Sequence, residues 1–152
     1  MDSIFNTVVV AGGASKCISA IGALYYLREK GHLDYIENYA GTSAGALICY
    51  FLTIGYTPLE LIHFLCKSTF IDEFQNLNLG AILEQRGLIN YYVIQEYLEK
   101  LTLNKIGFVP TFRDIRMKFR KNLTIVVYNL TTNTTEYLSA DNYPDMPCLT
   151  AL

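Results

Sequence analysis

Residues 40–47 read AGTSAGAL and place Ser43 between two glycines, Gly41 and Gly45. This Gly-x-Ser-x-Gly pattern is weak by itself, because three fixed small residues in five positions recur by chance in many proteins. Its context is more specific. The preceding residues have strand character, and residues 44–54 are an apolar run typical of a buried helix. The stretch therefore predicts a sharp turn from a strand into a helix, with Ser43 at the turn.

The same order of strand, glycine turn and helix occurs earlier in the chain. Residues 7–11 (TVVVA) are a short β-branched run that ends at Gly12 and Gly13, as a strand buried on both faces would. Residues 18–30 repeat apolar side chains at helical spacing, and Gly31 supplies a left-handed stop. In a parallel sheet the residues of a binding or active site lie at the carboxyl ends of the strands. We therefore expect both glycine turns to open onto one crevice.

The remaining patterns predict more helices and one hairpin. Thr57-Pro58 and Thr111 with Asp114 are typical helix starts, and residues 70–86 fit no clear pattern. We expect helices over 58–68, 90–101 and 111–121, strands at 35–40, 123–129 and 135–139, and a helix that begins in 144–152. Strands that alternate with helices predict an α/β fold with a mainly parallel central sheet, formed by residues 1–152 as a single domain.

The amino-acid composition of the chain disfavours several classes of function. The chain has 152 residues, of which 51% are hydrophobic and 17% are charged, with a net charge of -2. Such a weak field does not favour nucleic-acid binding, and the basic run 113–121 is interpreted as a solvated helix face. The start of the chain lacks signal-peptide features, and no apolar run reaches the roughly 20 residues of a spanning helix. We expect a cytoplasmic protein that is soluble or touches a membrane only at its surface.

Other candidate sites have simpler interpretations. The four cysteines are scattered without a Cys-x-x-Cys pair, so buried free thiols are favoured over disulfides or zinc ligands. His32 is expected at the surface, and His63 in a partly buried packing role rather than as a general base. The loop from Gly12 to Lys16 lacks the Gly-Lys-Ser/Thr ending of a P-loop and the glycine spacing of a dinucleotide site, which disfavours a nucleotide-binding module.

Two segments together resemble a known family. VVVAGGASKCISAIGALYYL (residues 8–27), followed by YAGTSAGAL (residues 39–47), is similar to the patatin-like phospholipases. Their pattern is a strand, a glycine-rich oxyanion loop that carries Lys or Arg, a helix, and then a strand with Gly-x-Ser-x-Gly. The resemblance implies a three-layer α/β/α fold, a lipid or phospholipid substrate, hydrolysis of its acyl esters without a metal or other cofactor, and a Ser-Asp dyad.

The resemblance assigns a role to each matching residue. Ser43 would be the nucleophile, and Gly12, Gly13 and Ala14 would form the oxyanion hole; Lys16 would anchor the loop or contact an anionic substrate. These roles agree with the chemistry, because a serine needs a base to take its proton and the tetrahedral intermediate needs N–H donors aimed at its oxygen. A helix that starts directly after the serine also points its positive end at developing negative charge.

Two departures from the family pattern have consequences. Ala14 and Cys17 stand where the family usually has glycine, and both residue types tolerate a positive φ poorly, so we expect a reshaped oxyanion loop. The chain also contains no Asp-Gly pair, which in this family carries the catalytic Asp. We therefore expect the general base to lie outside this chain, which would be the N-terminal portion of the full family domain. The alternative is a truncated or decayed homologue that binds lipid or protein without catalysis.

Overall fold

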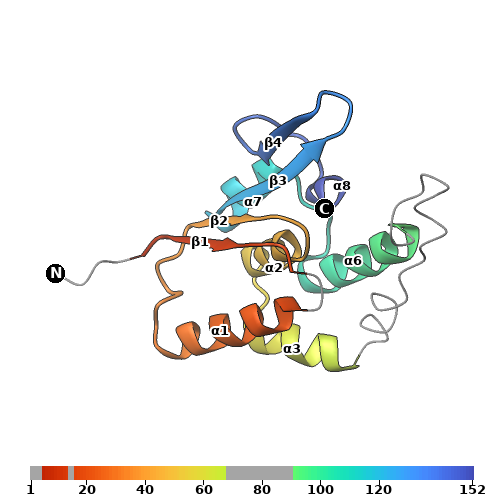
Figure 1. The fold of residues 1–152 in the computed structure, drawn as a ribbon. Coiled ribbons are helices and arrows are strands. Elements are labelled where there is room, and N and C mark those ends of the chain that lie inside the picture. Colours follow the sequence, from red (N-terminus) through yellow and green to blue (C-terminus); the bar gives the residue numbers. More distant parts are fainter. Residues whose placement is uncertain (1–4, 14–15, 68–90) are drawn as a thin grey trace.

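The computed structural model describes residues 5–13, 16–67 and 91–152, and its labels are those of Figure 1. The elements are β1 (Thr7–Val10), α1 (Cys17–Glu29), β2 (Asn38–Gly41), α2 (Ala44–Thr53), α3 (Pro58–Lys67), α6 (Tyr91–Ile106), α7 (Phe112–Phe119), β3 (Asn122–Asn129), β4 (Thr134–Ser139) and α8 (Cys148–Ala151). The ambiguous stretch 70–86 and the expected helix start at Asn90 lie outside the described residues. No described helix has both the length and the apolar character needed to cross a membrane.

The strands form one sheet in the order β1-β2-β3-β4. The first three are parallel, and β4 returns antiparallel to β3 as the predicted hairpin. Val10 pairs with Gly41, and Gly41 pairs with Ile125, so β1 and β2 end at the same rim. The predicted α/β fold with a mainly parallel sheet flanked by helices is therefore confirmed.

The core lies mainly between the sheet and the helices below it. Helices α1, α2 and α3 lie on one side of β1 and β2 in Figure 1, and α2 is buried over most of its length. Nearly all of its residues are apolar, which explains why it occupies the centre of the core. The largest fully buried side chains include Tyr50, Phe112, Ile36, Ile54, Ile115 and Ile125.

The predicted helix starts are formed by side-chain caps. The Thr57 backbone N–H donates to Glu60 at 2.7 Å, and the Glu60 N–H donates to the Thr57 hydroxyl at 3.1 Å. Thr111 and Asp114 make the same reciprocal pair at the start of α7. Such a reciprocal pair is a capping box, and it satisfies backbone N–H groups that have no partner inside the helix.

Helix and strand ends differ from expectation where turns intervene. Strand β2 begins at Asn38 rather than residue 35, because the turn after α1 continues through a hydrogen bond from the Ile36 N–H to the Leu33 carbonyl. Helix α6 runs to Ile106, and Gly107 (φ 79°) ends it. Helix α7 stops at Phe119, since Arg120 adopts a left-handed conformation.

Burial confirms two expected thiols and corrects one histidine. Cys49 and Cys148 are buried and free, and burial raises the pKa of each thiol to about 12. Such thiols pack as small apolar groups and do not react at neutral pH. His32 is exposed as predicted, whereas His63 is exposed on α3 and does not take the predicted packing role. The side chain of Cys66 lies outside the described residues.

A buried hydrogen bond joins α2 to α6 and supports a stability prediction. The Thr102 hydroxyl donates to the Leu98 carbonyl at 2.8 Å and lies 2.9 Å from the Tyr50 hydroxyl. Thr102→Val leaves the Tyr50 hydroxyl buried without this partner, so we expect a loss of about 1–3 kcal/mol in the free energy of unfolding. Urea unfolding followed by circular dichroism measures this loss.

The double variant Tyr50→Phe/Thr102→Val is the matched control. It removes both polar groups, so it is expected to recover most of the stability that Thr102→Val loses. If both variants lose the same amount of stability, the hydroxyl pair does not hold the two helices together.

Candidate active site

Ser43 occupies a strained turn between β2 and α2. Its backbone has φ 54° and ψ -132°, a combination that L-residues rarely adopt. The residue is exposed, and its side chain does not cap α2, although it stands at the N-cap position. Its hydroxyl makes no hydrogen bond with any described residue. The turn therefore presents a free hydroxyl to solvent at the carboxyl rim of the sheet.

The two glycines of the motif are needed for their small size and not for their backbone conformation, since neither has a positive φ. A Cβ added at Gly41 would lie 2.6 Å from the carbonyl of Gly45. A Cβ added at Gly45 would lie 2.1 Å from the carbonyl oxygen of Val10 and 2.7 Å from that of Ala11. All these neighbours are backbone atoms, so a side chain at either glycine forces the strands and α2 apart.

The first glycine loop meets Ser43 directly. A Cβ added at Gly12 would lie 3.2 Å from the Ser43 Cβ and 3.4 Å from the Thr42 carbonyl oxygen. The Thr42 N–H also donates to the Val10 carbonyl at 3.4 Å, where β1 ends. The two glycine turns therefore lie side by side at one rim, as the sequence predicts. Gly13 is one residue further along this loop, and Ala14 lies outside the described residues.

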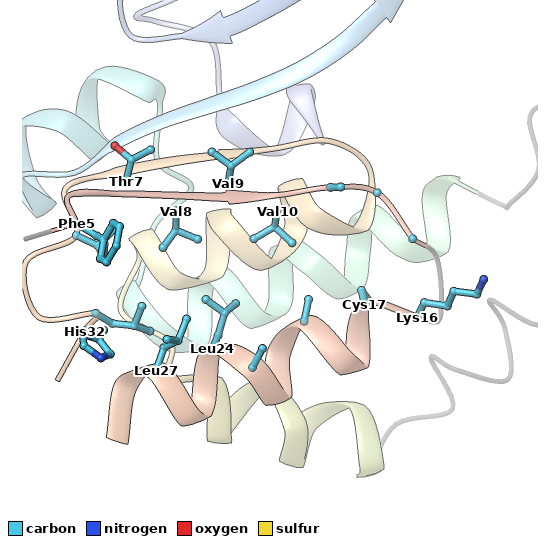
Figure 2. Close-up of a pocket in the computed structure, with 17 residues that line it drawn as sticks. Phe5, Thr7, Val8, Val9, Val10, Lys16, Cys17, Leu24, Leu27 and His32 are labelled. Carbon is cyan, nitrogen blue, oxygen red and sulfur yellow. The ribbon is translucent and has the colours of Figure 1, made fainter. Parts of the chain in front are cut away.

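Cys17, at the start of α1, does not distort the oxyanion loop in the way that the sequence led us to expect. Cys17 is the first residue of α1 and has no positive φ, so a cysteine fits at this position without backbone strain. Burial raises the pKa of the Cys17 thiol, which argues against a reactive thiolate at the start of α1. The Lys16 N–H donates to the Gly13 carbonyl at 2.9 Å, and the exposed Lys16 side chain extends away from the loop (Figure 2).

An apolar groove runs along β1 from this loop. It has a volume of about 780 Å³ and lies between β1 and α1. Val8 and Val10 point into it from the strand, and Leu24 and Leu27 face them from the helix (Figure 2). Lys16 lies at one end of the groove, and Phe5 and His32 lie at the other (Figure 2). Gly12 and Gly13, which follow β1 in the chain, also line the groove.

The sequence model described as patatin-like phospholipase matches residues 8–152. The chain belongs to the patatin-like phospholipase family. It is also 31% identical over 154 residues to the "Probable lipid hydrolase 463L" of Invertebrate iridescent virus 6. That alignment covers 97% of this chain and 51% of the viral protein, so the chain spans about half the length of this relative.

Solved structures share the patatin-like fold. The type III effector protein ExoU superposes with a TM-score of 0.72 at 16% identity, covering 97% of this chain and 38% of ExoU. ExoU in complex with SpcU from Pseudomonas aeruginosa gives a TM-score of 0.67 at 20% identity, covering 97% of this chain and 37% of that one. At these identities the likeness concerns the fold alone.

Four acidic side chains of the described residues form ion pairs with basic side chains and not with Ser43. Asp114 pairs with Lys118 at 2.9 Å, Asp141 with Arg116 at 2.7 Å, Asp145 with Arg113 at 2.9 Å and Glu60 with Lys105 at 2.8 Å. His32 lies at the far end of the groove from the Gly12–Gly13 loop. No described carboxylate or imidazole bonds to the Ser43 hydroxyl. The sequence already indicates that Ser43 lacks its expected Asp partner, because the chain contains no Asp-Gly pair.

Proposed function

We propose that this chain is the nucleophile-bearing part of a serine lipid acyl hydrolase. Ser43 attacks the ester carbonyl of a phospholipid or a related lipid, and N–H groups of the loop at Gly12 and Gly13, extended by Ala14, hold the oxyanion. The observation that carries the proposal is the direct contact between the Gly12 loop and the exposed Ser43. A nucleophile beside preorganised N–H donors is the arrangement that acyl transfer requires.

The proposal assigns the remaining parts by their chemistry. The general base is an Asp supplied from outside this chain, since no described acid or imidazole meets the Ser43 hydroxyl. Lys16, exposed at the N-cap of α1 next to the loop, contacts an anionic group of the lipid or anchors the loop. The reaction takes place in the cytoplasm at the surface of a membrane, where lipid esters are available.

Covalent labelling by a fluorophosphonate tests the proposal. The protein is assayed as the 152-residue chain and as a chimera, in which the chain replaces the matching portion of the viral hydrolase 463L. We expect the probe to label the chimera at Ser43 and to leave the Ser43→Ala chimera unlabelled, because only an activated serine reacts. Mass spectrometry of tryptic peptides identifies the labelled residue.

The parent hydrolase is the control for a competent site. If a chimera with native circular dichroism stays unlabelled while the parent reacts, Ser43 is not an activated nucleophile. That outcome favours the non-catalytic alternative, in which the chain binds lipid or protein.

A further inference from the structure

The hairpin of β3 and β4 projects beyond the rim that holds Ser43. Gly41, the last residue of β2, pairs with Ile125, and β3 continues beyond this pair through residues 126–129. At about 3.3 Å per residue, this extension carries the hairpin roughly 13 Å past the end of β2. Figure 1 shows the loop of the hairpin standing clear of α1, α2 and α3. The loop is therefore a projection at the rim where the lipid ester is proposed to bind.

Residues 128–135, the hairpin tip, are uncharged and apolar at the apex. Leu130 is 87% exposed, more than any other large apolar side chain of the described residues. Tyr128 and Tyr137 are 55% and 57% exposed. Tyr137 pairs with Val126, two residues before Tyr128, so both tyrosines lie on one face of the hairpin. An apolar apex above amphipathic rings is the pattern of a surface that enters the boundary between water and lipid.

Several polar groups of the hairpin tip are bonded to one another. The N–H groups of Thr131 and Thr132 donate to Oδ1 of Asn129 at 2.9 and 3.2 Å. The Tyr128 hydroxyl donates to Oδ1 of Asn133 at 2.7 Å. A polar group that leaves water without a hydrogen-bond partner is costly to bury. These internal bonds therefore lower the cost of moving the hairpin tip from water into a lipid surface.

The size and charge of the hairpin tip favour a neutral lipid surface over a protein partner. A stable protein interface takes about 20–30 residues from each side, and a single projecting loop of residues 128–135 supplies far fewer. Basic residues are what draws a protein to anionic lipids, whereas this tip has no charge and the whole chain carries a net charge of -2. The match in charge is therefore with an uncharged or zwitterionic headgroup such as phosphatidylcholine.

We propose that the hairpin tip anchors the protein on a neutral phospholipid bilayer. Leu130 inserts among the acyl chains, and Tyr128 and Tyr137 lie at the level of the headgroups. The anchor turns the rim that holds Ser43 towards the ester groups of the lipid, so its purpose rests on the proposed function. The binding itself does not need the Ser43 hydroxyl, because the hairpin tip is a separate part of the surface.

Tryptophan fluorescence of the 152-residue chain tests the insertion. The chain contains no tryptophan, so Leu130→Trp places a single reporter at the apex. We expect phosphatidylcholine vesicles to shift its emission to shorter wavelength, and lipids brominated on the acyl chain to quench it. Tyr35→Trp is the matched control, because Tyr35 is 63% exposed and precedes β2, at the opposite end of the strands. Vesicles are expected to leave the emission of Tyr35→Trp unchanged.

A matched pair of serine variants measures the contribution of Leu130 to binding. Leu130→Ser removes the apolar apex and adds no charge, so we expect it to weaken flotation with phosphatidylcholine vesicles about 10-fold or more. Met117→Ser removes an apolar side chain that is 73% exposed on α7, the helix that precedes β3 at the end opposite to the hairpin tip. It is expected to leave flotation unchanged. Circular dichroism checks that both variants keep the fold.

Three outcomes overturn the proposal. The first is an emission of Leu130→Trp that vesicles leave unchanged, or that responds no more than the emission of Tyr35→Trp. The second is a shift without lipid that grows with protein concentration, which identifies a second copy as the partner. The third is binding that requires phosphatidylserine and disappears in high salt, which identifies a charged surface elsewhere. The same results are expected in a Ser43→Ala background, so failure here is distinct from failure of the fluorophosphonate test.

Discussion

Gly45→Ala is expected to unfold much of the protein or to lower its free energy of unfolding by roughly 3 kcal/mol or more, at or above the top of the range for overpacked cores. The new Cβ would lie 2.1 Å from the Val10 carbonyl oxygen and 2.7 Å from that of Ala11. Both atoms belong to the backbone where β1 ends, so relief requires α2 to move away from β1. Chemical unfolding followed by circular dichroism measures the loss.

Gly22→Ala is the matched control for this prediction. Gly22 lies within α1, and a Cβ at this position meets nothing within 4 Å. The same chemical change is expected to stabilise the protein by about 0.5–1 kcal/mol, because alanine favours a helix interior more than glycine does. Equal stability of Gly45→Ala and the unmodified protein contradicts the close approach of α2 to β1.

Local patterns in the sequence were sufficient for the elements around the site. The β-branched run at residues 7–11, the glycine stops and the capping boxes depend on residues close together in the chain, and the structure confirms them. The shared rim of the two glycine turns also followed, because parallel strands have a common carboxyl end.

Tertiary contacts account for what the sequence did not predict. The glycine pattern identified Gly45, but only the folded chain shows that its hydrogen atom faces the Val10 carbonyl. Exposure of His63 depends on which face of α3 packs against the core, and its apolar neighbours in the sequence did not reveal this. The run of valines predicts a strand buried on both faces, and this was wrong: Val9 is 74% exposed, and among the described strands β1 pairs with β2 alone.

The backbone of Ser43 suggests that stability was given up for function. Its φ of 54° and ψ of -132° lie in a region that costs an L-residue about 1–3 kcal/mol, whereas glycine adopts it freely. Glycine occurs at positions 41 and 45 of the same turn, yet a serine stands at the strained position between them. A purely structural turn would favour glycine here, so the strain supports the proposal that the hydroxyl is needed.

Ser43→Gly is therefore expected to raise stability and abolish activity in the same protein. We expect a gain of about 1 kcal/mol in the free energy of unfolding, because relief of the strain exceeds the entropy that glycine adds to the unfolded chain. Turnover of p-nitrophenyl esters by the chimera is expected to fall on the order of 10⁴-fold or more, as for loss of the nucleophile in a known serine hydrolase. Ser43→Ala separates the two effects, since it removes the hydroxyl and keeps the strain, so it should lose turnover without the gain in stability. A Ser43→Gly variant that is less stable than Ser43→Ala, or that retains turnover, contradicts the assignment of Ser43 as a strained nucleophile.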